Sequence, residues 1–201
     1  MSTFLKPISV REELLKQGIR IFTPRVFSSV FNSGRVSTKY FLETQTKNNL
    51  FGRLKKGLYF LKANPPSEEE IANALYRPSY LSFEYALAYH GVLPEMVYTI
   101  TSATTKSTRL FEVENSNYSY RTIKKEAFTG YTLIKKSNRS FLMADLEKAL
   151  VDYAYFVVLK KTPVNDRLFD LIKGKTNIDK INKYSKLYKN RLLENLLKTI
   201  I

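Results

Sequence analysis

Residues 23–61 read TPRVFSSVFNSGRVSTKYFLETQTKNNLFGRLKKGLYFL, and the fold of the first third of the chain depends on this stretch. Thr23 followed by Pro24 is typical of a helix start, because a Thr hydroxyl caps free backbone amides and Pro fits the first helical position. After this start, four apolar residues at helical spacing predict one buried helix face: Val26, Phe27, Val30 and Phe31.

A second helix is expected after a short turn. Residues 32–35 read NSGR, a composition that is typical of turns. Ser37 is then expected to cap a helix that runs to about Lys47, with Tyr40 and Phe41 directed toward the core. The sequence therefore predicts two helices joined by a turn.

A hairpin is expected after these helices. Apolar segments at 50–54 and 58–61 are joined by Lys55–Gly57, which suits a hairpin tip. Upstream, the capping box SVRE at 9–12 predicts an earlier helix, and the alternation at 19–22 predicts a short strand. The predicted order is helix, strand, helix, turn, helix, hairpin, which is the order of a winged helix-turn-helix.

The rest of the chain predicts a mixed sheet with helices. Five segments have the composition of strands: 97–101, 110–113, 118–123, 131–134 and 141–143. Asp145 is expected to begin a long helix, and the tail from Asn165 onward is expected to be helical. The predicted fold class is therefore α+β, a winged helix-turn-helix followed by a mixed-sheet α/β domain with carboxy-terminal helices.

The domain boundary is expected near the residues NPP at 64–66, because two prolines interrupt both helix and sheet. The box SEEE at 67–70 predicts a short helix within this connection. We therefore expect a DNA-binding domain at 1–63, a linker with a connecting helix at 64–77, and a second domain at 78–201.

Positive charge is concentrated at the two ends of the chain. The 201 residues include 33 Lys and Arg against 18 Asp and Glu, a net charge of +15. Residues 1–65 carry a net +9, residues 66–160 a net zero, and residues 161–201 a net +6. This distribution favours a polyanionic partner, although a lysine-rich proteome would produce a similar composition.

The composition also excludes several classes of site. The chain has no Cys and one His, which excludes disulfides, thiol nucleophiles, Cys-containing zinc sites and sites with several His ligands. A hydrolase would have to use carboxylates alone, or Ser with Lys. The apolar runs are too short to span a membrane, and the amino terminus lacks a signal-peptide core, so we expect a cytoplasmic protein.

Candidate DNA contacts lie on the third predicted helix and on the hairpin. The helix offers hydroxyls at its start, cations that can donate to guanine or phosphate, and one acid that can accept from cytosine. The hairpin offers cations for the DNA backbone or minor groove. The candidates are Arg35, Ser37, Thr38, Lys39, Glu43, Thr46, Lys47, Arg53, Lys55 and Lys56.

Other polar residues receive no catalytic assignment. His90 follows an aromatic helix and has no nearby acid pair, so a packing or helix-end role is favoured. Asp145 suits a helix start, and Glu147 and Asp152 lie five residues apart, a spacing that does not share one helix face. The hydroxyl-rich run 99–108 lacks the glycines of a phosphate-binding loop. We predict no catalytic residue, no metal site and no cofactor.

Three stretches resemble a known family. Residues 78–91 read PSYLSFEYALAYHG, and VYTIT follows at 97–101. Together they resemble the AbiEi family of antitoxins, and DLEKALVD at 145–152 is similar to the PEKALLD helix of that family. This chain has Asp145-Leu146 where family members often have Pro or a similar helix opener. The resemblance spans roughly residues 10–160.

The resemblance implies a bacterial antitoxin of a type IV toxin–antitoxin system linked to abortive phage infection. It implies that the winged helix binds double-stranded DNA at the protein's own promoter and represses the operon. It further implies that the second domain counteracts a nucleotidyltransferase-like toxin without a stable complex between the two proteins. The shared motif at 80–91 suits helix packing, and no catalytic role is transferred to it.

Two other interpretations stay open. The chain is also consistent with a solitary winged-helix transcriptional regulator whose second domain senses a ligand or a protein. A third interpretation is an RNA-binding protein or an enzyme whose basic ends hold RNA, although the motifs argue against catalysis. An adjacent nucleotidyltransferase-like gene favours the antitoxin, and binding to duplex DNA rather than RNA at matched salt separates the nucleic-acid interpretations.

Overall fold

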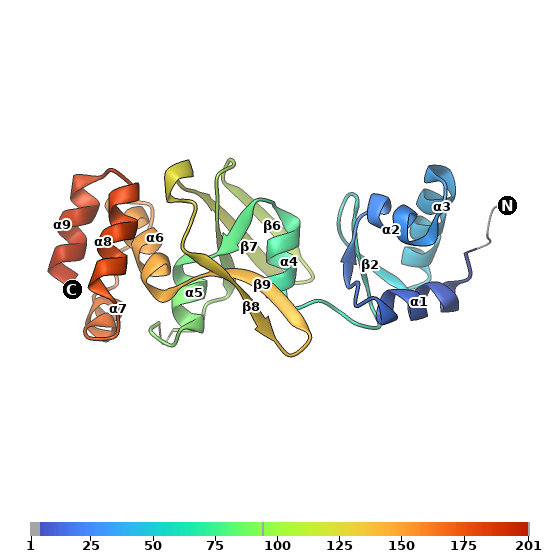
Figure 1. The fold of residues 1–201 in the computed structure, drawn as a ribbon, viewed down its shortest axis with the longest axis horizontal. Helices are drawn as coiled ribbons and strands as arrows, with labels where there is room; N and C mark the ends of the chain where they lie inside the picture. The colour runs from blue at the N-terminus through green and yellow to red at the C-terminus, as the bar shows by residue number, and fades with distance from the viewer. Residues whose placement is uncertain (1–4, 94, 201) are drawn as a thin grey trace. The chain divides into compact units, whose positions relative to one another are not determined.

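The computed structural model describes residues 5–93 and 95–200 and divides into two compact units at Ser67 and Glu68 (Figure 1). We call the described residues up to Ser67 unit 1 and those from Glu68 onward unit 2. Both units contain helices and strands, so the predicted α+β class is confirmed.

Unit 1 has the predicted order of elements. They are α1 (Pro7–Lys16), β1 (Ile21–Phe22), α2 (Pro24–Phe31), α3 (Arg35–Lys47), β2 (Phe51–Lys55) and β3 (Leu58–Leu61). The strands form an antiparallel sheet in the order β1-β3-β2. Gly57 takes a φ of +76° after Lys56, a conformation that glycine adopts without strain, and it closes the β2–β3 turn.

Aromatic packing orients α3 in unit 1. The buried ring of Phe27 on α2 lies 5.7 Å from Phe22, 5.7 Å from Phe41 and 6.2 Å from Phe51, measured between ring centroids. These rings come from β1, α3 and β2, so one side chain joins α2 to two strands and to α3. Burying a phenylalanine contributes about 1.5–3 kcal/mol, which makes this cluster a large part of the unit's stability.

Three local predictions for unit 1 are wrong. α1 begins at Pro7 rather than at the SVRE box, because Pro occupies the first helical position and Lys6 precedes it without a side-chain cap. α3 begins at Arg35 after an extended Gly34, not at Ser37. Val26, which was expected on the buried face of α2, is 43% exposed, because Phe27 alone turns fully into the core.

Unit 2 contains a six-stranded sheet and six helices among its described residues. The strands are β4 (Ser79–Leu81), β5 (Thr99–Thr104), β6 (Arg109–Val113), β7 (Ser116–Thr122), β8 (Tyr131–Lys136) and β9 (Arg139–Ala144). The α-helices are α4 (Glu68–Leu75), α5 (Phe83–Tyr89), α6 (Leu146–Val158), α7 (Asp166–Ile172), α8 (Ile178–Leu187) and α9 (Arg191–Ile200). A short 3₁₀ turn, η1 (Lys125–Ala127), follows β7.

The sheet of unit 2 is mixed, as predicted. Its order is β6-β7-β5-β4-β9-β8, with β5 parallel to β7, β4 parallel to β9, and the other neighbours antiparallel. The five predicted strands are present, with shifted ends. The central strand β4 was not predicted, because its three residues lie between a proline and a helix start and show no alternation.

Helices cover both faces of this sheet. Tyr120 donates its hydroxyl to the Ala72 carbonyl of α4, so α4 covers the face to which Tyr120 points. The next residue, Arg121, points to the opposite face and binds Glu84 of α5 at 2.9 Å. α4 therefore belongs to unit 2, although its residues were expected in the connection between domains.

Candidate nucleic-acid interface

Helix α3 has one buried face and one exposed face. The buried face consists of Thr38, Phe41, Leu42 and Gln45. On the opposite side, Val36 is 83% exposed and Tyr40 is 73% exposed, and Glu43 and Lys47 continue the same stripe at helical spacing. The two apolar side chains therefore lie in the middle of the face that points away from the core.

The prediction that Tyr40 points inward is wrong. Phe41 and Leu42 fill the interior instead, and moving one residue along a helix rotates a side chain by about 100°. Lys39 and Glu43 are exposed, as the DNA-contact prediction requires. The sequence did not identify Tyr40 because an aromatic residue beside Phe41 is normally assigned to the core.

Two of the predicted DNA contacts are turned inward. Thr38 is 1% exposed, and its hydroxyl lies 2.7 Å from the Ser33 hydroxyl, where it joins α3 to the preceding turn. Thr46 is half-buried and donates its hydroxyl to the Leu42 carbonyl at 2.7 Å. Both hydroxyls are used inside unit 1, so we remove Thr38 and Thr46 from the candidate interface.

The other predicted contacts are exposed on two adjoining elements. Arg35, Ser37, Lys39, Glu43 and Lys47 are exposed on α3, and Arg53, Lys55 and Lys56 are exposed on or beside the β2–β3 hairpin. The Arg53 guanidinium lies 6.0 Å from the centre of the Tyr59 ring, and its Nε donates to the Lys55 carbonyl at 3.4 Å. These contacts hold Arg53 close to the hairpin tip.

The charge of this surface is strongly one-sided. α3 and the hairpin carry six cations, Arg35, Lys39, Lys47, Arg53, Lys55 and Lys56, against the single acid Glu43. Across the described residues, Arg35, Lys39, Lys47 and Lys56 make no ion pair. Unpaired cations on a helix and a neighbouring hairpin suit a partner that supplies regularly spaced negative charge.

Sequence comparison adds no functional assignment to this surface. No protein-family model and no curated protein matches the chain. The candidate interface is therefore supported by its geometry and charge alone.

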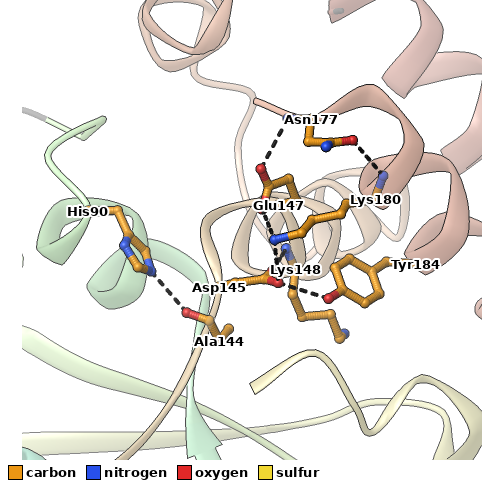
Figure 2. Close-up of polar contacts among 8 residues, drawn as sticks. All are labelled: His90, Ala144, Asp145, Glu147, Lys148, Asn177, Lys180 and Tyr184. Carbon is orange, nitrogen blue, oxygen red and sulfur yellow. Dashed lines mark hydrogen bonds and ion pairs between the residues drawn. The ribbon is translucent and has the colours of Figure 1, made fainter. Parts of the chain in front are cut away.

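A second polar cluster joins α6 to α8, and Figure 2 shows its side chains. Asp145 caps α6 by accepting from the Lys148 amide at 2.8 Å, as the sequence predicts, and it also accepts from the Tyr184 hydroxyl at 2.8 Å. Glu147 accepts from the Asn177 amide at 3.0 Å. Lys180 lies between the two carboxylates, 3.4 Å from one and 3.5 Å from the other.

These contacts give the cluster a structural role. Asp145 and Glu147 raise the pKa of Lys180, so this lysine stays charged and holds α8 against the start of α6. A Cβ at Gly130 would lie 2.8 Å from the Tyr184 ring, so only glycine allows this close approach. His90 lies beside the cluster, with its Nε2 2.9 Å from the Ala144 carbonyl (Figure 2). Within residues 5–93 and 95–200, no three His, Asp or Glu side chains are placed to hold a metal ion.

Asp152 is fully buried in unit 2 and accepts several hydrogen bonds. It accepts hydrogen bonds from Ser82 at 2.7 Å, Tyr80 at 3.0 Å, and from Lys148 and Tyr188. All five side chains have 0% relative exposure. Burial lowers the pKa of Lys148 and raises the pKa values of Tyr80 and Tyr188.

This network contains Ser, Lys and Asp, the residue types that composition left available for catalysis. Ser82 donates its hydroxyl to the carboxylate instead of to a basic nitrogen, and full burial leaves no surface of Ser82 or Lys148 for a substrate to contact. The network joins β4, the start of α5, α6 and the end of α8. We therefore assign it to folding. The sequence offered one signal for it, a Lys and an Asp four residues apart in a helix that is mostly apolar after its first turn.

Proposed function

We propose that unit 1 is a winged helix-turn-helix domain that binds double-stranded DNA. The observation that carries this proposal is the exposed face of α3, which lies opposite an aromatic core, in a unit that also carries a cationic hairpin. An α-helix fits the major groove of B-DNA, and the first residues of a recognition helix face the base edges. Lys39 and Glu43 would then meet base edges, while Arg53 and Lys56 would meet phosphates.

We propose further that the protein is a bacterial cytoplasmic antitoxin that represses its own operon. This part is supported by the resemblance of residues 78–101 and 145–152 to AbiEi antitoxins. In unit 2 these stretches form β4, α5, the start of β5 and the start of α6, at the centre of the fold. The partner would be a nucleotidyltransferase-like toxin that unit 2 counteracts without a stable complex. Within the described residues, none of the helices has both the length and the hydropathy needed to cross a membrane.

Alanine substitution of Arg53, Lys55 and Lys56 is expected to weaken binding to the DNA upstream of the gene. The three cations neutralise phosphates, so their loss should lower the slope of log affinity against log salt by about three. An electrophoretic mobility shift at several salt concentrations measures both the affinity and the slope.

The control for this experiment removes the same charge from unit 2. Lys175, Lys183 and Lys186 are exposed there, and their triple alanine variant should retain wild-type binding. If the two triple variants bind alike, the hairpin is not the phosphate contact. Tighter binding of the wild-type protein to duplex RNA than to duplex DNA at matched salt would favour the RNA-binding alternative.

Co-expression with a neighbouring nucleotidyltransferase-like gene is expected to restore the growth that this gene alone arrests. The motifs that carry the AbiEi resemblance, at 78–101 and 145–152, lie outside the hairpin. The Arg53, Lys55 and Lys56 triple variant should therefore still rescue growth while it fails to repress the promoter. Colony counts measure rescue, and a promoter–reporter fusion measures repression. Failure of the wild-type protein to rescue would refute the antitoxin assignment and leave DNA binding in place.

A further inference from the structure

The centre of the exposed α3 face is apolar, and the proposed phosphate contacts do not account for it. Val36 and Tyr40 lie one helical turn apart and are 83% and 73% exposed. Side chains that are this exposed contribute nothing to the core of unit 1, since the aromatic cluster lies on the opposite side of α3. The cations Lys39 and Lys47 and the acid Glu43 lie beside this pair on the same helix.

The chemistry of Val36 restricts what it can recognise. Its side chain has no hydrogen-bonding atom, so it distinguishes ligands only by apolar contact. In the major groove of DNA, thymine carries an apolar group at its edge, the 5-methyl group, whereas cytosine and uracil have hydrogen at the same ring position. The Tyr40 ring, one turn further along, offers a second apolar surface of the same kind.

Charge complementarity selects the occupant of this face. Arg35 and Lys39 flank the apolar pair on one side of α3, Lys47 lies two turns beyond Tyr40, and the hairpin adds three further cations. An apolar partner surface on a protein would leave these cations without neutralising charge. A DNA major groove has phosphates along both rims and thymine methyl groups on its floor, which suits an apolar pair that is flanked by cations.

We propose that Val36, together with the Tyr40 ring, reads thymine 5-methyl groups in the major groove, so the target site is a thymine-containing duplex. This inference rests on the proposed DNA-binding function and adds the base that the helix recognises. Val36 and Tyr40 are specificity-determining residues, whereas Lys39, Lys47 and the hairpin cations supply affinity that is independent of sequence.

The test replaces thymine by uracil without changing any hydrogen-bonding group. The DNA upstream of the gene is synthesised with deoxyuridine in place of thymidine, and its affinity is compared with that of the normal duplex. Each contacted methyl group should contribute about fourfold in affinity, since burial of one methyl-sized group is worth about 0.8 kcal/mol. Wild-type protein should therefore bind the uracil duplex several-fold more weakly.

Two alanine variants show whether the lower affinity for the uracil duplex depends on a side chain of α3. Val36→Ala should prefer the thymine duplex about fourfold less than wild type does, because it loses the methyl contact of Val36 and keeps that of Tyr40. Val164→Ala removes the same atoms from an exposed position of unit 2 and should keep the full wild-type preference for thymine. Because both positions are exposed, neither variant should alter folding.

The outcomes separate this inference from the proposed function. Equal affinity of the wild type for the two duplexes would overturn methyl recognition while leaving DNA binding intact. The inference would also be overturned if replacing thymine by uracil lowered the affinity equally for wild type, Val36→Ala and Val164→Ala. The effect would then come from the DNA itself. Failure of the wild type to bind either duplex would refute the proposed function.

Discussion

Replacing Asp152 with alanine is expected to destabilise unit 2 by about 3–5 kcal/mol, because the change leaves a buried charge without its partner. The Lys148 ammonium is fully buried, and its counter-charge is the Asp152 carboxylate. The hydroxyls of Tyr80, Ser82 and Tyr188 lose the same acceptor. A loss of this size is comparable to the whole free energy of unfolding of a small domain, so unit 2 should be unfolded in most molecules of the variant.

An exposed ion pair in the same unit provides the control. Asp170 pairs with Lys173 at 2.9 Å on α7, and both side chains are more than half exposed. Asp170→Ala should leave stability nearly unchanged, because solvent screens the pair. Urea unfolding measures both variants, and amide exchange in α6 assigns the loss to unit 2. Equal unfolding midpoints for the two variants would show that Asp152 does not organise the fold.

Replacement of Lys148 by methionine tests the same network from the other partner. Asp152 would keep three hydroxyl donors, and methionine would fill most of the volume of the lysine stem. The loss of stability should therefore be smaller than for Asp152→Ala. A larger loss would mean that the ammonium, and not the carboxylate, is the centre of the network.

Unit 2 is expected to lose stability steeply as the pH rises above 10. Burial raises the pKa values of seven tyrosines in this unit, two of them, Tyr118 and Tyr153, to about 12 from an ordinary value of 10.0. The other five are also raised: Tyr80, Tyr85, Tyr120, Tyr184 and Tyr188. These hydroxyls stay protonated in the fold but ionise in the unfolded chain.

The sign of the effect follows from proton binding. Below pH 10 these tyrosines are protonated in both states, and the stability they contribute is fully present. Between pH 10 and the raised pKa values the folded state holds more protons, so each tyrosine removes up to about 1.4 kcal/mol per pH unit. Burial lowers the pKa of Lys148, so this group acts in the opposite direction, but only below its ordinary pKa of 10.5, and it does not offset the tyrosines above that pH.

Two measurements check this prediction. Ultraviolet absorbance of tyrosinate, recorded as the native protein is titrated, should show that half of the 14 tyrosines do not ionise until unit 2 unfolds. Circular dichroism at the same pH values should show unfolding of unit 2 before pH 12. Ionisation of all 14 tyrosines near pH 10 with an unchanged fold would contradict the prediction.

Local signals in the sequence were sufficient for the order of elements in unit 1. Thr23-Pro24, the NSGR turn and the Lys55–Gly57 tip each specify a boundary through backbone geometry that depends on neighbouring residues only. The same reasoning placed Asp145 at the start of α6, where its side chain caps the helix. Where two local signals competed at the start of α1, Pro7 prevailed over the SVRE box.

The orientation of side chains needed the tertiary structure. Tyr40 and Phe41 are adjacent aromatics, and the local pattern assigned both to the core, but Phe41 packs against Phe27 and Phe51 while Tyr40 is exposed. Thr38 lies at the start of α3 and has a hydroxyl that could bind phosphate, yet this hydroxyl is hydrogen-bonded to the Ser33 hydroxyl. The apolar centre of the candidate interface was therefore not predicted.

The sequence by itself determined the α+β class, the order of elements in unit 1, the positive charge of unit 1 and the lack of cysteine chemistry, because these depend on composition and on contacts between near neighbours. The tertiary structure alone decided the strand order of unit 2, the face that α3 exposes, and the five-residue network at Asp152. Those features join residues up to 108 positions apart, from Tyr80 to Tyr188, and such contacts form only when the whole core is assembled.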